Sequence, residues 1–242
     1  MKKIILSLLF LIVPFKIIAG PAGDDFKHIE PYFYVAIAEA SYEGTKNGAQ
    51  ERLNQLLGSN QAKVLDFKDH SSVLYGSNHF ILVEDRLGGK HIAIEGSNSA
   101  RNWLGNLVGF PGRGLVAEYD VPPRIRKSMQ KIVEGWKKKH QHIISIVGHS
   151  QGGMYASQLK ASKKDKYKHT VAMTFNGYKI KKDKNSDQYH FLIKTEHAAS
   201  LLTSSGRYIK LNKGSGHLKI ISNHGMEYFL SRIKDKNWSN IL

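Results

Sequence analysis

The order of elements predicted along the chain indicates an α/β fold, with a largely parallel central sheet flanked by helices. From residue 122 onward, short apolar runs alternate with segments of helical periodicity. One of these runs leads into a tight glycine turn at Gly148–Gly153, and a further helical segment follows the turn. Strands that alternate with helices in this way are typical of a parallel sheet whose helices connect the strands.

The individual elements follow from the spacing of apolar residues. Residues 122–140 repeat apolar side chains every three or four positions with Lys and Arg between them, which predicts an amphipathic helix. Leu87-Gly88-Gly89 separates two apolar runs and predicts a hairpin turn. No repeat or linker divides the chain beyond residue 24, so a single domain over 24–242 is expected. The predicted helices cover 31–42, 50–57, 122–140, 154–162 and 226–233, and the predicted strands cover 72–74, 79–83, 91–94, 142–147, 170–175, 189–193 and 207–211.

The first residues have the outline of a secretory signal peptide. Lys2 and Lys3 precede an apolar stretch over 4–18, and small residues follow it. This stretch is short for a membrane span, although an uncleaved anchor is the alternative. We expect a signal peptide over 1–19 that is cut near Ala19 to Ala22, and export to the periplasm or out of the cell.

The composition limits the classes of protein and of partner. With 41% hydrophobic and 23% charged residues among 242, the chain can bury one sizeable core and is neither disordered nor fibrous. It has no cysteine, which excludes disulfides, thiolate metal sites and a lipid anchor on cysteine. Without the three lysines of the signal segment, 33 basic residues face 20 acidic ones, a net charge of +13. This charge favours anionic partners, and a solvated lysine surface is the alternative.

The sequence Gly148-His149-Ser150-Gln151-Gly152 fits the pattern of a nucleophile elbow. In this pattern a serine occupies a sharp turn between a strand and a helix, and neighbours without side chains let the backbone bend. The helix that follows points N–H groups toward an oxyanion that forms at the serine. Because the pattern here lies between a predicted strand and a predicted helix, Ser150 is the candidate nucleophile. An incidental serine in a glycine-rich turn is the alternative.

A serine hydroxyl needs a general base, and in this order of elements the base follows the serine in the chain. Of the histidines after Ser150, only His217 and His224 come late enough to follow a further strand and an acid. His224 directly precedes the closing helix, a loop position that suits a residue reaching over the sheet edge. We therefore prefer His224 as the base, with His217 as the alternative.

The acid that orients the imidazole has three candidates, Asp183, Asp187 and Glu196. Asp183 and Asp187 lie in a lysine-rich polar stretch typical of a solvated loop. Glu196 comes just after the apolar run 191–193, at a strand end, where the catalytic groups of such sheets collect. Glu196 is the preferred acid and Asp187 its main rival, and a surface ion pair is the alternative to a catalytic role.

Residues around the elbow carry a resemblance to a known family. Residues 91–107 (HIAIEGSNSARNWLGNL) end a predicted strand in the pair Gly96-Ser97 and continue to the pair Asn102-Trp103. In these features the chain resembles the lipase class 3 family, the fungal-lipase-like branch of the α/β hydrolases. Further matching positions are Thr174-Phe175-Asn176-Gly177, Glu196, His224 and Tyr228.

The resemblance implies an α/β-hydrolase fold and an oxyanion hole formed by the backbone N–H groups of Ser97 and Gln151. A negative oxygen needs two such preorganised donors. Three positions depart from the family pattern: Glu95 stands where Arg is common, Gln151 where Leu is usual, and Glu196 where Asp is usual. These departures concern the substrate class and the acid more than the nucleophile.

Together these features predict an exported serine ester hydrolase that forms an acyl-serine intermediate on a lipid or phospholipid, with no metal or organic cofactor. An anionic membrane surface is the expected partner, and no specific nucleic acid is. Residues 104–114, rich in glycine and large apolar residues, are either a flap over the site or an irregular loop. The alternatives are an esterase for a non-lipid ester and a non-catalytic basic protein that binds anionic surfaces.

Overall fold

The computed structural model describes ten separate parts of the chain. The predicted signal segment, the predicted strand over 72–74 and the predicted flap over 104–114 lie outside them. None of the helices in the described parts combines the length and the hydropathy that crossing a membrane requires. The described residues are 31–70, 78–96, 123–162, 167, 170–175, 188–193, 207–211, 226, 229–230 and 233.

Seven strands of the described residues form one mixed sheet in which the strand order follows the chain order. The first three strands pair antiparallel, and from the third strand onward every pairing is parallel. The expectation of a largely parallel sheet is therefore confirmed for the second part of the chain only. The strands are β1 (Ala62–Asp69), β2 (His79–Asp85), β3 (Lys90–Ile94), β4 (Ile143–His149), β5 (Val171–Phe175), β6 (Gln188–Ile193) and β7 (Arg207–Leu211).

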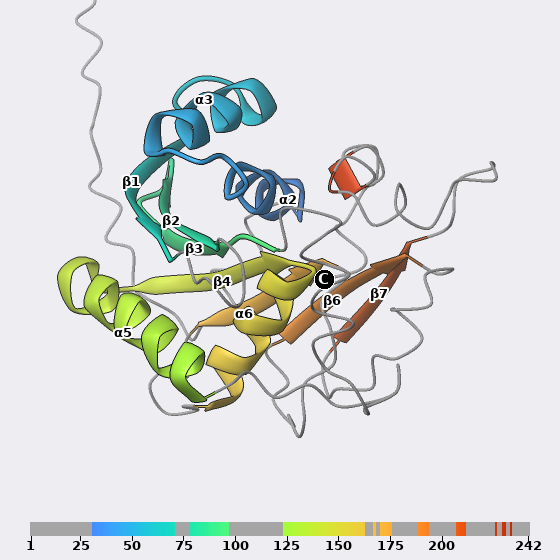
Figure 1. Cartoon of the computed structure of the whole chain (residues 1–242). Coiled ribbons are helices and arrows are strands. Elements are labelled where there is room, and N and C mark those ends of the chain that lie inside the picture. Colours follow the sequence, from blue (N-terminus) through green and yellow to red (C-terminus); the bar gives the residue numbers. More distant parts are fainter. Residues whose placement is uncertain are drawn as a thin grey trace, which may run out of the picture.

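Among the described residues, two pairs of helices cover the two faces of this sheet. Figure 1 shows α2 (Pro31–Ala40) and α3 (Lys46–Leu57) on one face, and α5 (Pro123–His140) and α6 (Gln151–Ser162) on the other. α5 connects β3 to β4 and α6 connects β4 to β5. Both connections advance the sheet in the same direction, so the usual right-handed crossover places both helices on one face.

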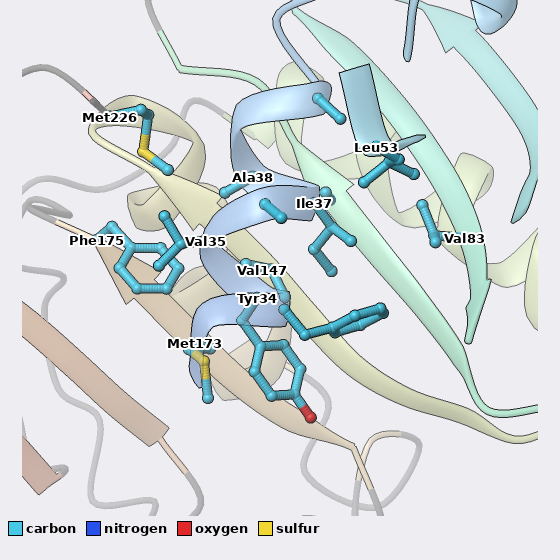
Figure 2. Packing of buried hydrophobic residues seen from close by; sticks show 14 of the residues in the cluster. Tyr34, Val35, Ile37, Ala38, Leu53, Val83, Val147, Met173, Phe175 and Met226 are labelled. Atoms are coloured by element: carbon cyan, nitrogen blue, oxygen red, sulfur yellow. The ribbon is translucent and has the colours of Figure 1, made fainter. Parts of the chain in front are cut away.

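Alternating strand residues supply the two halves of the core. Phe80, Leu82, Ile92, Ile94 and Ile146 face α5 and α6, where Met129, Val133 and Trp136 of α5 meet them. The residues between them, such as Ile81, Ala93 and Val147, face α2 and α3. Figure 2 shows α2 lying across this second face, with Val35 beside Phe175 of β5. The period-2 alternation thus buries both faces of the central strands.

Sequence features explain where the helices begin and end. Thr45 caps α3 by accepting a hydrogen bond from the Gly48 N–H, and α3 ends at Gly58, whose φ is +88°. Both helices of the first pair match the predicted ones to within a few residues. α6 begins at Gln151, three residues earlier than predicted, because Gly152 and Gly153 belong to its first turn and not to the preceding loop.

The sequence did not predict β1. Its residues, AKVLDFKD, alternate only weakly, and the strand is half exposed at the edge of the sheet. Pairing with β2 stabilises it, from Ala62 opposite Asp85 to Asp69 opposite His79. A half-exposed edge strand that is held by pairing with its neighbour shows only weak alternation of apolar residues.

Three segments of backbone pack very closely where α6 follows β4. A Cβ atom on Gly148 would overlap the backbone of Gly152, and a Cβ on Gly152 would overlap the carbonyl oxygen of Ile94. Three backbone segments therefore meet here with only hydrogen atoms between them. Backbone atoms cannot rotate aside as a side-chain tip can, so glycine is required at both positions.

We expect Gly152→Ala to lower the free energy of unfolding by about 2–3 kcal/mol or more, because overpacking against fixed backbone forces the elements apart. The matched control is Gly135→Ala on the exposed face of α5, where an added Cβ meets nothing within 4 Å. That change should raise stability by about 0.5–1 kcal/mol through helix propensity. Urea unfolding of both variants is the measurement, and equal stability of the two would contradict the close crossing.

Candidate active site

Ser150 occupies the turn between β4 and α6, the context that the sequence predicts for a nucleophile elbow. Its φ is +52°, in the left-handed region that non-glycine residues rarely adopt. The Ser150 N–H donates to the carbonyl of Phe175 on β5 at 2.9 Å, and its own carbonyl accepts from the Met154 N–H at 3.1 Å. The strained turn is thus fixed on one side by the sheet and on the other by the helix.

The side chain of Ser150 is not held by a hydrogen bond to any other described residue. Its hydroxyl oxygen is buried and has no hydrogen-bond partner among the described residues. Gln151 follows as the first residue of α6, so its backbone N–H is one that the helix cannot satisfy from within. The positive end of the α6 dipole therefore lies at the serine, where it stabilises a developing negative charge.

The end of β3 packs directly against this turn. A Cβ atom on Gly96 would contact the Tyr42 hydroxyl, the His149 carbonyl oxygen and, at 3.3 Å, the Cβ of Ser150. Gly96 is therefore needed for the close approach of the two segments. The predicted oxyanion donor Ser97 comes next in the sequence and lies outside the described residues.

Tyr42 is a residue at this site that the sequence analysis missed. Its hydroxyl lies 2.6 Å from Nδ1 of His149, the residue before the candidate nucleophile. The His149 ring also packs edge-on against Phe229, at 6.2 Å between ring centroids. These contacts hold His149 in place beside the turn. No local sequence signal identifies Tyr42, because this residue follows α2 and is distant in sequence from the elbow.

The predicted site residues are only in part among those that the structure describes. Ser150 and Gln151 are described, and the structure brings both to the carboxyl end of β4. His190 is the histidine after Ser150 that belongs to a described strand; it hydrogen-bonds Thr174 at 2.8 Å, and burial lowers its pKa to about 4. Ser97, Asp183, Asp187, Glu196, His217 and His224 lie outside the described residues.

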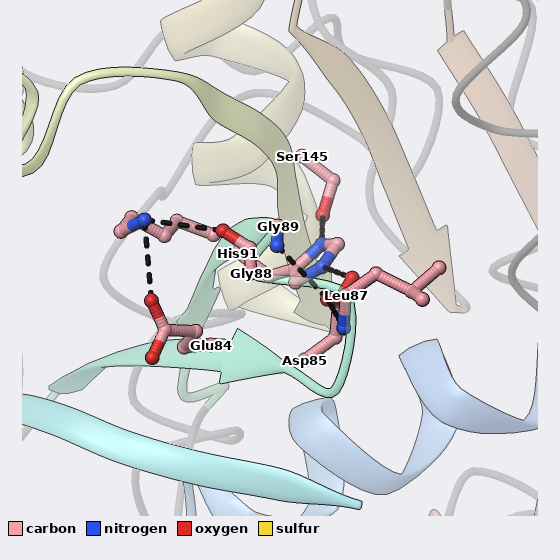
Figure 3. A network of polar contacts seen from close by, with 8 residues as sticks. Glu84, Asp85, Leu87, Gly88, Gly89, His91 and Ser145 are labelled. Atoms are coloured by element: carbon pink, nitrogen blue, oxygen red, sulfur yellow. Dashed lines mark hydrogen bonds and ion pairs between the residues drawn. The ribbon is translucent and has the colours of Figure 1, made fainter. Parts of the chain in front are cut away.

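A second set of serine, histidine and aspartate lies far from the elbow. Figure 3 shows His91 on β3 between Ser145, at 2.8 Å from Nδ1, and Asp85, at 2.9 Å from Nε2. The other oxygen of Asp85 accepts the N–H groups of Leu87 and Gly89 and so closes the hairpin turn.

This set has no catalytic geometry. His91 and Ser145 are fully buried, and Ser145 lies within a regular strand. In a catalytic triad Nε2 faces the serine and Nδ1 faces the acid, the reverse of the arrangement here. Burial lowers the pKa of His91 despite its acidic partner. The hydrogen bond from His91 lowers the pKa of Asp85, although burial alone would raise it. The network therefore anchors the β2–β3 hairpin to β4.

Among the described residues, no three His, Asp or Glu side chains are placed to hold a metal ion together. The described chemistry of the elbow consists instead of a hydroxyl, backbone N–H groups and a helix N-terminus. These are the parts that nucleophilic catalysis on a carbonyl uses.

Known proteins match this chain in structure and not in sequence. No protein-family model and no curated protein matches the sequence. The Lip2 lipase from Yarrowia lipolytica matches in structure with a TM-score of 0.52 at 11% identity, over 77% of this chain and 78% of that one.

Two further structures match more weakly. The lipase from Rhizopus microsporus var. chinensis has a TM-score of 0.48 at 12% identity, over 69% of this chain and 66% of that one. A bacterial heroin esterase has a TM-score of 0.35 at 9% identity, over 87% and 98%. The match with the Yarrowia lipase shows that this chain shares the fold of that protein.

Proposed function

We propose that the chain is an exported serine hydrolase that cleaves a carboxylic ester, with a lipid or phospholipid as substrate. The observation that carries this proposal is the left-handed turn at Ser150 between β4 and α6, with the end of β3 packed against it. A serine held in a strained turn at a helix N-terminus is arranged for attack on a carbonyl and for stabilising the resulting oxyanion. The fold shared with a lipase agrees with this chemistry.

In the proposed mechanism Ser150 Oγ attacks the ester carbonyl while His224 takes its proton. The backbone N–H groups of Gln151 and Ser97 bind the oxygen that becomes negative. His224 then returns the proton to the departing alcohol, and an acyl-serine remains. Water, activated by the same imidazole, hydrolyses this intermediate, and Glu196 keeps the imidazole oriented throughout.

The register of the parallel strands supports Glu196 over Asp187 as the acid. Phe175 pairs with both His149 and Phe191, so the elbow is level with the carboxyl end of β6. Glu196 follows that end by three residues, whereas Asp187 directly precedes the first residue of β6. With about 3.3 Å per residue, the start of β6 lies roughly 13 Å below the level of the elbow.

The packing of the closing segment supports His224 as the base. Met226, two residues after His224, is buried in the core on the α2 face. Phe229 packs against both His149 and Phe175, at 6.2 and 5.4 Å between ring centroids. The segment that follows His224 is thus anchored beside the residue that precedes Ser150.

The charge of the chain supports an anionic membrane as the surface on which the enzyme acts. α5 carries Lys127, Lys131, Lys138 and Lys139 as exposed residues. The helix begins at the sheet edge where the elbow lies and ends at the opposite edge, just before β4. Lys127 and Lys131 are therefore the lysines of α5 nearer the elbow, suited to a surface that the site faces.

We expect Ser150→Ala to abolish both hydrolysis of p-nitrophenyl esters and labelling by a fluorophosphonate probe, because the hydroxyl is the covalent centre. His224→Ala should be about as damaging, since members of a triad act as a unit, and His217→Ala is the matched control that should stay near wild type. The outcomes also separate the proposal from a non-catalytic basic protein. Wild-type protein that is folded but takes up no probe would favour the binding protein.

Glu196→Gln should lower kcat by a factor of about 10² to 10⁴ with little change in the free energy of unfolding, because the acid supports an imidazolium that exists only during the reaction. Asp187→Asn is the control, since Asp187 directly precedes the first residue of β6 in the sequence. Steady-state kinetics on a soluble ester measures both. A large loss in Asp187→Asn with none in Glu196→Gln would move the acid to Asp187.

Hydrolysis of anionic phospholipid vesicles should fall between low and high salt, while hydrolysis of a short soluble ester stays level. Attraction of a net charge of +13 to the vesicle is screened within about 8 Å at physiological ionic strength, but the site acts at contact distance. Replacing Lys127 and Lys131 by Glu should weaken vesicle hydrolysis more than replacing Lys138 and Lys139. Equal salt sensitivity for both substrates would show that the charge serves another anionic partner.

A further inference from the structure

The β2–β3 ladder ends in an unusual exchange of hydrogen bonds. Phe80 pairs with Ile94, so His79 and Glu95 form the next pair in register. In a regular antiparallel ladder two such residues exchange both backbone hydrogen bonds. The Glu95 N–H does donate to the His79 carbonyl at 2.9 Å. The His79 N–H, however, donates to the side-chain oxygen Oε2 of Glu95 at 2.7 Å.

The carboxylate of Glu95 thus takes the place of its own backbone carbonyl. That carbonyl instead accepts from the Asn78 amide at 3.3 Å and lies against α6, where a Cβ on Gly152 would meet it at 2.7 Å. The chain leaves the ladder at Glu95, and Gly96 packs onto Ser150. The side chain of Glu95 therefore determines where β3 turns from β2 toward the candidate nucleophile.

A buried carboxylate at this place needs a positive partner. Glu95 is 0% exposed, and Oε2 lies 2.9 Å from Nδ1 of His79. Its other oxygen has no hydrogen-bond partner among the described residues. An uncompensated negative charge beside the elbow would oppose the oxyanion that ester cleavage creates. His79 is the described side chain that can neutralise this charge.

The surroundings of His79 favour its protonated form. The adjacent carboxylate of Glu95 raises the pKa of His79 above its ordinary value of 6.5, although partial burial opposes the shift. From β1, Asp69 lies 3.9 Å from Nε2 and the ring of Phe67 packs at 5.1 Å. After α2, the backbone of Ser41 hydrogen-bonds the ring. The ion pair is complete below this raised pKa and is lost as the pH rises through it.

We propose that Glu95 and His79 form a positioning pair for the candidate nucleophile, which shapes the end of β3 beside Ser150 and is electrically neutral only while His79 is protonated. The inference rests on the proposed ester hydrolysis and adds an upper pH limit to that activity. The rate should rise with pH as the catalytic histidine loses its proton and fall again as His79 loses its own. Neither residue contacts the substrate in this account.

The test is the pH dependence of kcat and KM for p-nitrophenyl acetate. Wild type should show a fall in kcat on the alkaline side with KM nearly constant. Glu95→Gln keeps an acceptor for the His79 N–H but carries no charge, so its alkaline fall should disappear. Its plateau should be lower by about tenfold, because a neutral acceptor holds the strand end less firmly. Asp69→Asn, which faces His79 from β1, is the matched control: it should retain the plateau and the fall, with the fall moved to lower pH because the Asp69 charge helps to keep His79 protonated.

His79→Gln gives an independent and opposite test. It leaves the carboxylate without a positive partner, so kcat should be low at every pH, by about 10- to 100-fold. Combining it with Glu95→Gln removes the charge as well and should bring kcat back up to that of Glu95→Gln alone. A purely structural role predicts further loss in the double variant, so absence of this rescue overturns the proposal.

The proposal and the proposed function fail in different ways. Wild-type protein that hydrolyses no ester at any pH overturns the proposed function and with it this role. Active wild type together with a Glu95→Gln variant that keeps the wild-type plateau and alkaline fall overturns the positioning pair alone. NMR titration of the His79 ring in the Ser150→Ala variant measures the pKa of His79 independently of enzymatic activity. A pKa at or below 6.5 there would contradict the ion pair.

Discussion

The close meeting of three backbone segments at the start of α6 is the constraint on which the rest of the structure depends. Gly148 lets β4 contact the first helical turn, and Gly152 lets that turn contact the end of β3. With side chains at either position the serine would move away from the strand end beside it. Ser150, with its left-handed φ of +52°, lies at the same crossing, between Gly148 and Gly152.

Local features of the sequence were sufficient to predict the elbow, and long-range ones were not. The glycines and serine of 148–152 are neighbours in the chain, so their pattern indicates strand, turn and helix without knowledge of the fold. The positions of the described helices and strands followed from apolar spacing, apart from edge strand β1. Tyr42 and the pair of Glu95 with His79 could not be predicted as site residues, because strand register and the packing of α2 bring them to the elbow. Glu95 did stand out as a departure from the family pattern, but only the ladder shows its partner.

The β2–β3 hairpin carries a histidine–carboxylate pair at each end, and the two pairs differ in what burial does to the histidine. At the turn, His91 is completely enclosed, and burial lowers its pKa, so the ring serves as a neutral bridge between Asp85 and Ser145. Asp85 has a lowered pKa, and its contribution to stability is present above its unfolded pKa and is lost as the pH falls through the folded value. At the other end, His79 keeps some exposure and gains a proton more readily. One hairpin therefore loses stability in strong acid at its turn end and loses its ion pair in alkali at its elbow end.

Electrostatic balance at the elbow follows from the sign of each nearby group. The N-terminus of α6 provides partial positive charge, and the reaction proposed for Ser150 creates a negative oxygen in front of it. A glutamate within the adjoining strand end works against that balance unless the imidazole of His79, 2.9 Å away, carries a proton. An arginine at the same position would need no such partner, since it adds positive charge at every pH. With Glu95, the chain instead makes the balance depend on the proton of His79, so the electrostatically favourable state is present below the raised pKa of that histidine and is lost above it.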